Sequence, residues 1–134
     1  MSTPIPPRPT DGELAILKVL WEDGPSTVRQ VQEALGRVKP TGYTTALKLL
    51  QVMTEKGLVA RDESQRTHVY RANCSEEQTQ GQLVGDLVRR AFGGSARKLV
   101  MRALASVPAS AEELAEIREL LDRLERERSQ GGGK

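Results

Sequence analysis

The fold is decided by residues 41–71, which read TGYTTALKLLQVMTEKGLVARDESQRTHVYR. Thr41 is predicted to cap a helix that continues to Lys56, because threonine favours the N-cap position and the apolar residues that follow recur at helical spacing. Gly57 is predicted to end the helix in the C′ position, where glycine adopts a left-handed conformation without strain. The first half of this stretch therefore predicts one uninterrupted helix.

The second half changes period. Residues 58–61 and 67–71 contain β-branched and aromatic side chains, and the polar residues 62–66 separate these two runs. Two short runs with a polar break between them are typical of a β-hairpin. We therefore expect a helix followed by a hairpin whose tip is exposed.

Two further helices are predicted upstream of this stretch. Thr10 and Glu13 have the spacing of a capping box and start a helix to about Glu22. Ser26 is predicted to cap a second helix that ends at Gly36. Three helices and then a hairpin, in this order, predict a winged helix-turn-helix domain over residues 10–74.

The remainder of the chain is predicted to be helical and to mediate dimerisation over residues 75–128. Helices are expected at 75–92, 95–105 and 110–127, with apolar residues along one side of the first and the last. A chain this small cannot cover all of this apolar surface, which therefore predicts a homodimer. The residues expected at the dimer interface are Leu83, Leu87, Phe92, Leu114, Ile117, Leu121 and Leu124.

Flexible tails are expected at both ends of the chain. Residues 1–9 are rich in proline and have no apolar periodicity, and residues 129–134 include three consecutive glycines. The fold class is thus mainly α with a small β-hairpin: a winged helix-turn-helix followed by C-terminal dimerisation helices.

The helix at 41–56 has two chemically different faces. Ala46, Leu49, Leu50 and Met53 fall on the side that packs against the other helices, whereas hydroxyl, amide and ammonium groups fall on the opposite side. Such groups can meet phosphates and base edges in the major groove of DNA, and the hairpin supplies two arginines beside them. The predicted DNA-binding residues are Thr41, Gly42, Tyr43, Thr44, Thr45, Lys48, Gln51, Arg61 and Arg66.

The distribution of charge supports a nucleic-acid partner better than the total charge does. The net charge is only +2 at pH 7. Between residues 29 and 61, however, six basic residues face only two acidic ones, and the predicted recognition helix lies in this range.

The sequence offers no arrangement of residues for catalysis. The chain has one histidine, His68, and one cysteine, Cys74, so it contains neither a triad nor a metal-ligand cluster within one subunit. Gly93-Gly94-Ser95 lacks the lysine of a phosphate-binding loop. We expect no enzyme activity, no cofactor and no metal, and the short apolar runs predict no membrane-spanning segment.

Several of these motifs resemble the penicillinase repressor family, the BlaI/MecI-like winged-helix regulators. They are GYTTAL at 42–47, MTEKGLV at 53–59 and HVYR at 68–71, and the resemblance covers about residues 10–127. It implies a homodimeric transcriptional repressor that binds a palindromic double-stranded DNA operator, in the bacterial cytoplasm at the nucleoid.

The chain also departs from the family pattern. Where the best-known members have an Asn-Phe bond that is cleaved when a membrane sensor protease is activated, this chain has Arg102-Ala103, so this signal is not carried over and an upstream sensor or protease stays unknown. Cys74 alone cannot supply the cysteine cluster of the copper-responsive branch. Many relatives have arginine where Val52 stands, so direct reading of guanine from this position is not expected. The alternative from another class is a winged helix that contacts proteins and has no sequence-specific DNA binding.

Overall fold

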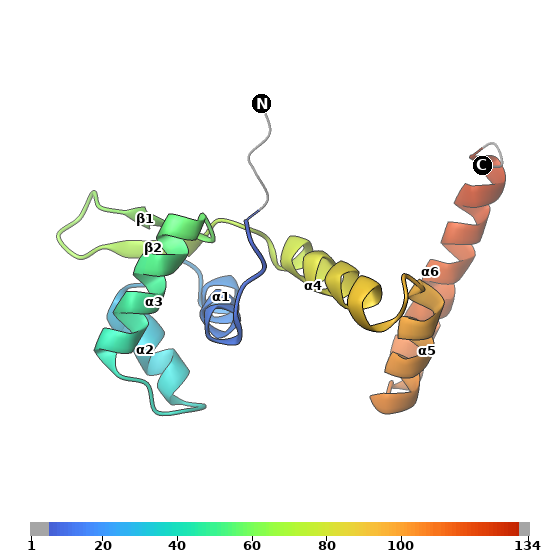
Figure 1. Ribbon diagram of the computed structural model, residues 1–134, viewed down its shortest axis with the longest axis horizontal. Coiled ribbons are helices and arrows are strands. Elements are labelled where there is room, and N and C mark those ends of the chain that lie inside the picture. Colours follow the sequence, from blue (N-terminus) through green and yellow to red (C-terminus); the bar gives the residue numbers. More distant parts are fainter. Residues whose placement is uncertain (1–5, 132–134) are drawn as a thin grey trace. The chain divides into compact units, whose positions relative to one another are not determined.

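The computed structural model describes residues 6–131, and the outermost parts of both predicted tails, 1–5 and 132–134, lie outside the described residues. The described chain is mainly helical with one antiparallel hairpin, which confirms the predicted fold class (Figure 1). The elements are α1 (Asp11–Asp23), α2 (Val28–Gly36), α3 (Tyr43–Lys56), β1 (Val59–Asp62), β2 (Val69–Ala72), α4 (Glu76–Ala91), α5 (Ala96–Ser106) and α6 (Ala111–Gln130).

The chain divides into two compact units between Asp86 and Leu87. This division lies inside α4, whereas the winged-helix domain was expected to end at residue 74, before the helix begins. The first turns of α4 therefore belong to the unit that contains α1–α3 and the hairpin.

Capping side chains fix the starts of the first two helices. Thr10 and Glu13 form the predicted capping box of α1. The cap of α2 is Thr27, which forms a capping box with Gln30, and the prediction that Ser26 caps this helix is wrong. Ser26 is buried instead, and its backbone N–H and C=O pair with those of Tyr70 in β2.

The start of α3 lies one residue later than predicted. Gly42 is the N-cap, because the hydroxyl of Thr41 donates to the carbonyl of Lys39 at 3.0 Å. The carbonyl of Thr41 also accepts a hydrogen bond from Gln32 Nε2, which ties this residue to α2. The other end agrees with the sequence, since Gly57 adopts a φ of 83° and closes the helix.

The hairpin pairs β1 with β2 in antiparallel fashion. Val59 lies opposite Ala72 at one end of the ladder, and Asp62 lies opposite Val69 at the other. The backbone N–H of Ser64 donates to Asp62 Oδ1 at 2.9 Å and stabilises the turn at the wing. His68 was expected within the second strand but lies one residue before it and is exposed.

The core of the first unit combines one face of each helix with the base of the hairpin. Of the residues predicted for the packing side of α3, Ala46, Leu50 and Met53 are fully buried, whereas Leu49 is half-buried and packs against the core. Tyr70 is the largest fully buried side chain and comes from β2. The remaining buried apolar residues are Ile16, Leu17, Leu20, Val28, Val31, Leu58 and Val59.

A charged pair connects α1 to α3 within this core. The carboxylate of Glu13 is only 2% exposed and accepts a hydrogen bond from Lys56 Nζ at 2.7 Å. Burial raises the pKa of Glu13, but the hydrogen bonds from Lys56 and from the Thr10 backbone more than offset this, so that the pKa lies below its ordinary value. The ionised carboxylate is therefore the form that stabilises the fold.

A Glu13→Gln protein is expected to lose about 1–2 kcal/mol of unfolding free energy at pH 7, because the neutral amide cannot pair with Lys56. The lowered pKa means that this stabilisation is present above the ordinary glutamate pKa of about 4.3 and is lost as the pH falls further. The unfolding free energy, measured with urea between pH 7 and pH 3, should therefore fall less steeply with decreasing pH for this variant than for the wild type. Glu22→Gln, on an exposed position of α1, is the control, and equal curves for both variants would refute the stabilising role.

The segment before α1 is packed rather than free. Pro9 is buried, the carbonyl of Pro6 accepts a hydrogen bond from Gln82 Nε2 at 2.9 Å, and Arg8 pairs with Asp86 at 2.6 Å. These contacts with α4 were not expected for the flexible tail predicted over residues 1–9. Sequence periodicity could not reveal this, because the partners lie more than 70 positions away on α4.

The second unit consists of the end of α4 with α5 and α6. Ser95 caps α5, and Ser110 forms a capping box with Glu113 at the start of α6. α6 continues to Gln130, so the flexible C-terminal tail predicted from residue 129 begins too early. Neither α5 nor α6 has a buried residue.

Apolar side chains of the second unit remain exposed. Leu121 and Leu124 of α6 are 53% and 49% exposed, and Met101 of α5 is 62% exposed. Of the other predicted interface residues, Leu87 is also exposed, whereas Leu83, Phe92, Leu114 and Ile117 are half-buried. Arg102-Ala103 lies within α5.

Candidate nucleic-acid interface

One side of α3 presents a continuous polar surface. Thr44, Thr45, Lys48 and Gln51 are all exposed, and the residues on the opposite side are the core residues of this helix. We call these four residues the polar stripe of α3. No carboxylate of the described residues pairs with Lys48 in a salt bridge, so its ammonium group is available to a phosphate.

The first turn of α3 adds backbone donors to the polar stripe. The N-cap is Gly42, which has no side chain to cap the helix, and it is exposed. The first amide groups of the helix therefore point outward with the positive end of the helix dipole, an arrangement that favours a phosphate.

Arg29 lies next to this helix end, although it was not among the predicted DNA-binding residues. Its guanidinium carbon is 5.8 Å from the centre of the Tyr43 ring. The contact joins α2 to α3 and places a positive charge beside the predicted contact residue Tyr43, which is 44% exposed. Helical periodicity could have placed Arg29 on the exposed side of α2, but not next to this ring.

The hairpin carries two arginines with different surroundings. Arg66 lies in the exposed turn of the wing. Arg61, by contrast, pairs with Glu63 at 2.6 Å, and this hydrogen bond, followed by one with Tyr70, raises the pKa of Arg61 above its ordinary value. Arg61 therefore has to exchange a carboxylate for a phosphate if it contacts DNA.

Fewer unpaired basic side chains lie near α3 than the sequence between residues 29 and 61 suggests, because Lys56 and Arg61 are paired with carboxylates. Lys56 is held by Glu13 at the far end of α3. The structure brings together the polar stripe, Gly42 and Tyr43 on one helix, whereas Thr41 belongs to the preceding turn and Arg61 is paired within the wing.

Comparison with known proteins identifies the family. The penicillinase repressor family profile matches residues 9–123. The chain belongs to this family. The transcriptional regulator BlaI of Mycobacterium tuberculosis is 32% identical over 117 residues, which are 86% of this chain and 83% of that protein.

A second relative carries the name of the family, and one solved structure shares the fold alone. The penicillinase repressor of Bacillus licheniformis is 23% identical over 116 residues, covering 87% of this chain and 91% of that protein. The solved structure of hsRosR-S4 in a complex shares the fold, with a TM-score of 0.51 and 14% identity over 87% of this chain and 90% of that one. The resemblance expected from the three motifs of the winged helix is therefore confirmed.

The described residues 6–131 contain no helix that is long and apolar enough to cross a membrane. Within the same range, no three histidine, cysteine or acidic side chains are grouped so that they could hold a metal ion.

Proposed function

We propose that the protein is a homodimeric transcriptional repressor that inserts α3 into the major groove of a palindromic operator. The observation that carries this proposal is the polar stripe of α3, which lies next to an uncapped helix start and in which Lys48 forms no salt bridge with any carboxylate of residues 6–131. Lys48 and the first-turn amides would bind phosphates, while Thr44 and Gln51 would contact base edges. Membership of the penicillinase repressor family supports the same role.

The exposed apolar surface of the second unit supports the homodimer. Large aliphatic side chains on α5 and α6 are one-third to two-thirds exposed, and a second copy of the chain would remove them from water. A two-fold dimer presents two copies of α3, which fits two half-sites of a palindrome. We propose that residues 75–128 form this interface.

The proposal is tested by selecting genomic DNA fragments on the purified protein at low salt and measuring the affinity of the selected site as the salt concentration rises. A repressor should select a palindrome and bind it with an affinity that falls steeply with salt, because each phosphate contact releases counterions. A winged helix that only contacts proteins would retain no fragment. Failure to enrich any sequence would therefore reject the proposal in favour of that second function.

Removing single side chains from the polar stripe should change sequence preference. Thr44→Ala or Gln51→Ala is expected to reduce discrimination at one operator position by about 1–3 kcal/mol, because each loses a base-edge contact. Thr54→Ala is the matched control, since its hydroxyl bonds to the carbonyl of Leu50 within α3. Binding to a library of operators with single base changes gives the preference, and unchanged profiles for both stripe variants would exclude base reading.

Releasing Arg61 from its partner should strengthen binding to DNA of any sequence. Glu63→Gln is expected to raise affinity for random DNA about two- to fivefold and to steepen the salt dependence by about one phosphate contact per subunit. Glu77→Gln, which removes the same charge from α4, is the control. An equal increase in both variants would show that only total charge matters.

A further inference from the structure

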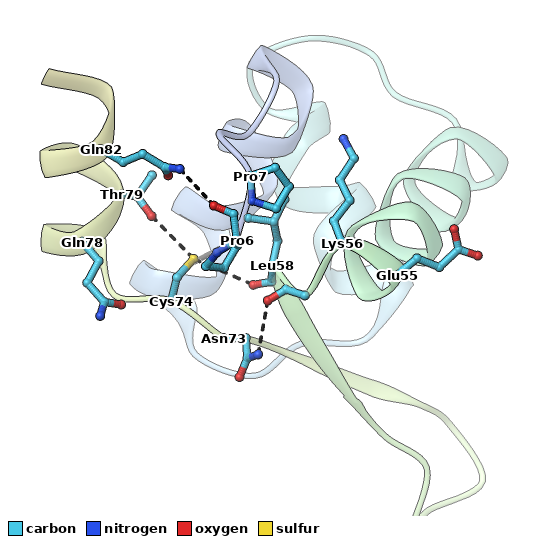
Figure 2. Close-up of a pocket in the computed structure, with 11 residues that line it drawn as sticks. Pro6, Pro7, Glu55, Lys56, Leu58, Asn73, Cys74, Gln78, Thr79 and Gln82 are labelled. Carbon is cyan, nitrogen blue, oxygen red and sulfur yellow. Dashed lines mark hydrogen bonds between the residues drawn. The ribbon is translucent and has the colours of Figure 1, made fainter. Parts of the chain in front are cut away.

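A cavity of about 630 Å³ lies in the first unit, between the end of α3 and the first turns of α4. Figure 2 shows residues of α4 on one side of it and the end of α3 on the other, with Pro6, Pro7 and Cys74 between them. Its size lies within the range of about 300–1,000 Å³ that is typical of small-molecule sites. The remaining lining residues are Glu55, Lys56, Gly57, Leu58, Asn73, Gln78, Thr79 and Gln82.

The charged groups at the cavity are not directed to its interior. The side chains of Glu55 and Lys56 extend away from Cys74 in Figure 2, and the ammonium group of Lys56 is held by Glu13. The wall around Cys74 consists of the proline rings, Leu58 and the methyl group of Thr79, whose hydroxyl faces the thiol at 3.5 Å. An anion would lose its hydration there without gaining a free cation.

The amide side chains leave acceptor atoms for a ligand. Gln82 uses its Nε2 to bind the carbonyl of Pro6, and Asn73 uses its Nδ2 to bind the carbonyl of Gly57 at 3.2 Å. Among the described residues, these bonds leave Gln82 Oε1 and Asn73 Oδ1 without a hydrogen-bond partner. A ligand in the cavity that donates an N–H or O–H would pair with Gln82 Oε1, whereas Asn73 is exposed and its Oδ1 points away from Cys74 in Figure 2.

We propose that this cavity binds a small uncharged ligand with an apolar ring system and a hydrogen-bond donor. The ligand would contact Gly57, the residue that ends α3, and the first turns of α4. If the free protein and the DNA-bound protein bind the ligand with different affinity, the ligand changes the affinity for the operator by the same factor. The binding itself does not depend on the proposed repressor function.

The test uses 2-naphthamide as the uncharged probe and 2-naphthoate as its anionic counterpart, both added to the full-length protein. We expect the amide to bind with a Kd below about 1 mM, a range suited to a fragment of this size, and at least about fivefold more tightly than the carboxylate. Backbone amide signals of Leu58, Asn73 and Thr79 should shift in nitrogen–proton NMR spectra, whereas those of α6 should not. No shift at these residues, or tighter binding of the carboxylate, would overturn the proposal.

Two variants of α4 separate the cavity from the rest of the surface. Gln78→Trp places a large ring at the cavity and should weaken 2-naphthamide binding at least tenfold, while Gln80→Trp changes an exposed position that does not line it. Equal affinities for the two variants would overturn the assignment. The sole cysteine gives a second measure, because bound amide should slow alkylation of Cys74 by N-ethylmaleimide in the wild type. An unchanged alkylation rate at saturating amide would overturn the location.

The two proposals can fail separately. A protein that binds 2-naphthamide in this cavity but selects no DNA would retain the ligand site and lose the repressor function. A protein that selects a palindrome but binds neither probe at the cavity would have the opposite result.

Discussion

Lys48→Glu is expected to lower operator affinity by at least about 100-fold per dimer while leaving the fold intact. The change replaces a cation in the polar stripe by an anion that faces the DNA phosphates, and juxtaposed like charges cost several kcal/mol. Because Lys48 is exposed and forms no salt bridge within the described part of the chain, its removal breaks no contact of the core. Fluorescence anisotropy of a labelled operator measures the affinity, and thermal unfolding checks the fold.

Lys18→Glu makes the same change of charge on an exposed position of α1. This control is expected to weaken binding only through the total charge of the protein, and therefore much less. If both variants lost the same affinity, α3 would have no special place in the complex, and the proposed orientation on DNA would be wrong.

Leu121→Asp is expected to raise the dissociation constant of the homodimer by at least about 100-fold. A two-fold interface contains every residue twice, so one substitution buries two carboxylates in an apolar environment. The exposed position of Leu121 in a single chain means that the isolated protomer should still fold. Sedimentation at micromolar concentration distinguishes monomer from dimer, and operator affinity should fall in parallel because the two half-sites are no longer bound together.

Arg126→Gln changes the charge of α6 by the same amount on the side opposite Leu121. We expect this protein to remain a dimer. A Leu121→Asp protein that sedimented as a dimer would show that the α6 surface lies outside the interface and would leave the exposed side chains of α5 to account for association.

Local patterns predicted most of the winged helix. The apolar period of α3, the left-handed Gly57 and the capping box at Thr10 depend on residues within a few positions of one another, so each could be recognised from the sequence alone. The errors at Ser26 and Thr41 have a common cause. The backbone of Ser26 pairs with Tyr70, and the hydroxyl of Thr41 bonds to the carbonyl of Lys39. Both partners lie outside the helix that the residue was expected to cap, and capping rules consider only residues of that helix.

The candidate site was less predictable because its charges depend on distant residues. In the sequence, Lys56 belongs to the basic excess around the predicted recognition helix. In the structure its charge is paired with Glu13, 43 positions away. Arg29 gained a role only through the ring of Tyr43. The pair between Arg61 and Glu63 was the exception, since two residues so close in the sequence can be considered together before the fold is known.

The bridge between Ser26 and Tyr70 has a consequence for how the protein would engage DNA. It fastens the start of α2 to β2 through two backbone hydrogen bonds of 2.9 and 2.8 Å, so that the wing cannot pivot freely about the helices. The spacing between α3 and Arg66 is then largely set during folding. The wing then loses less conformational entropy when the protein binds DNA. A rigid wing also cannot adapt to a DNA groove of a different width, so that such DNA would bind more weakly.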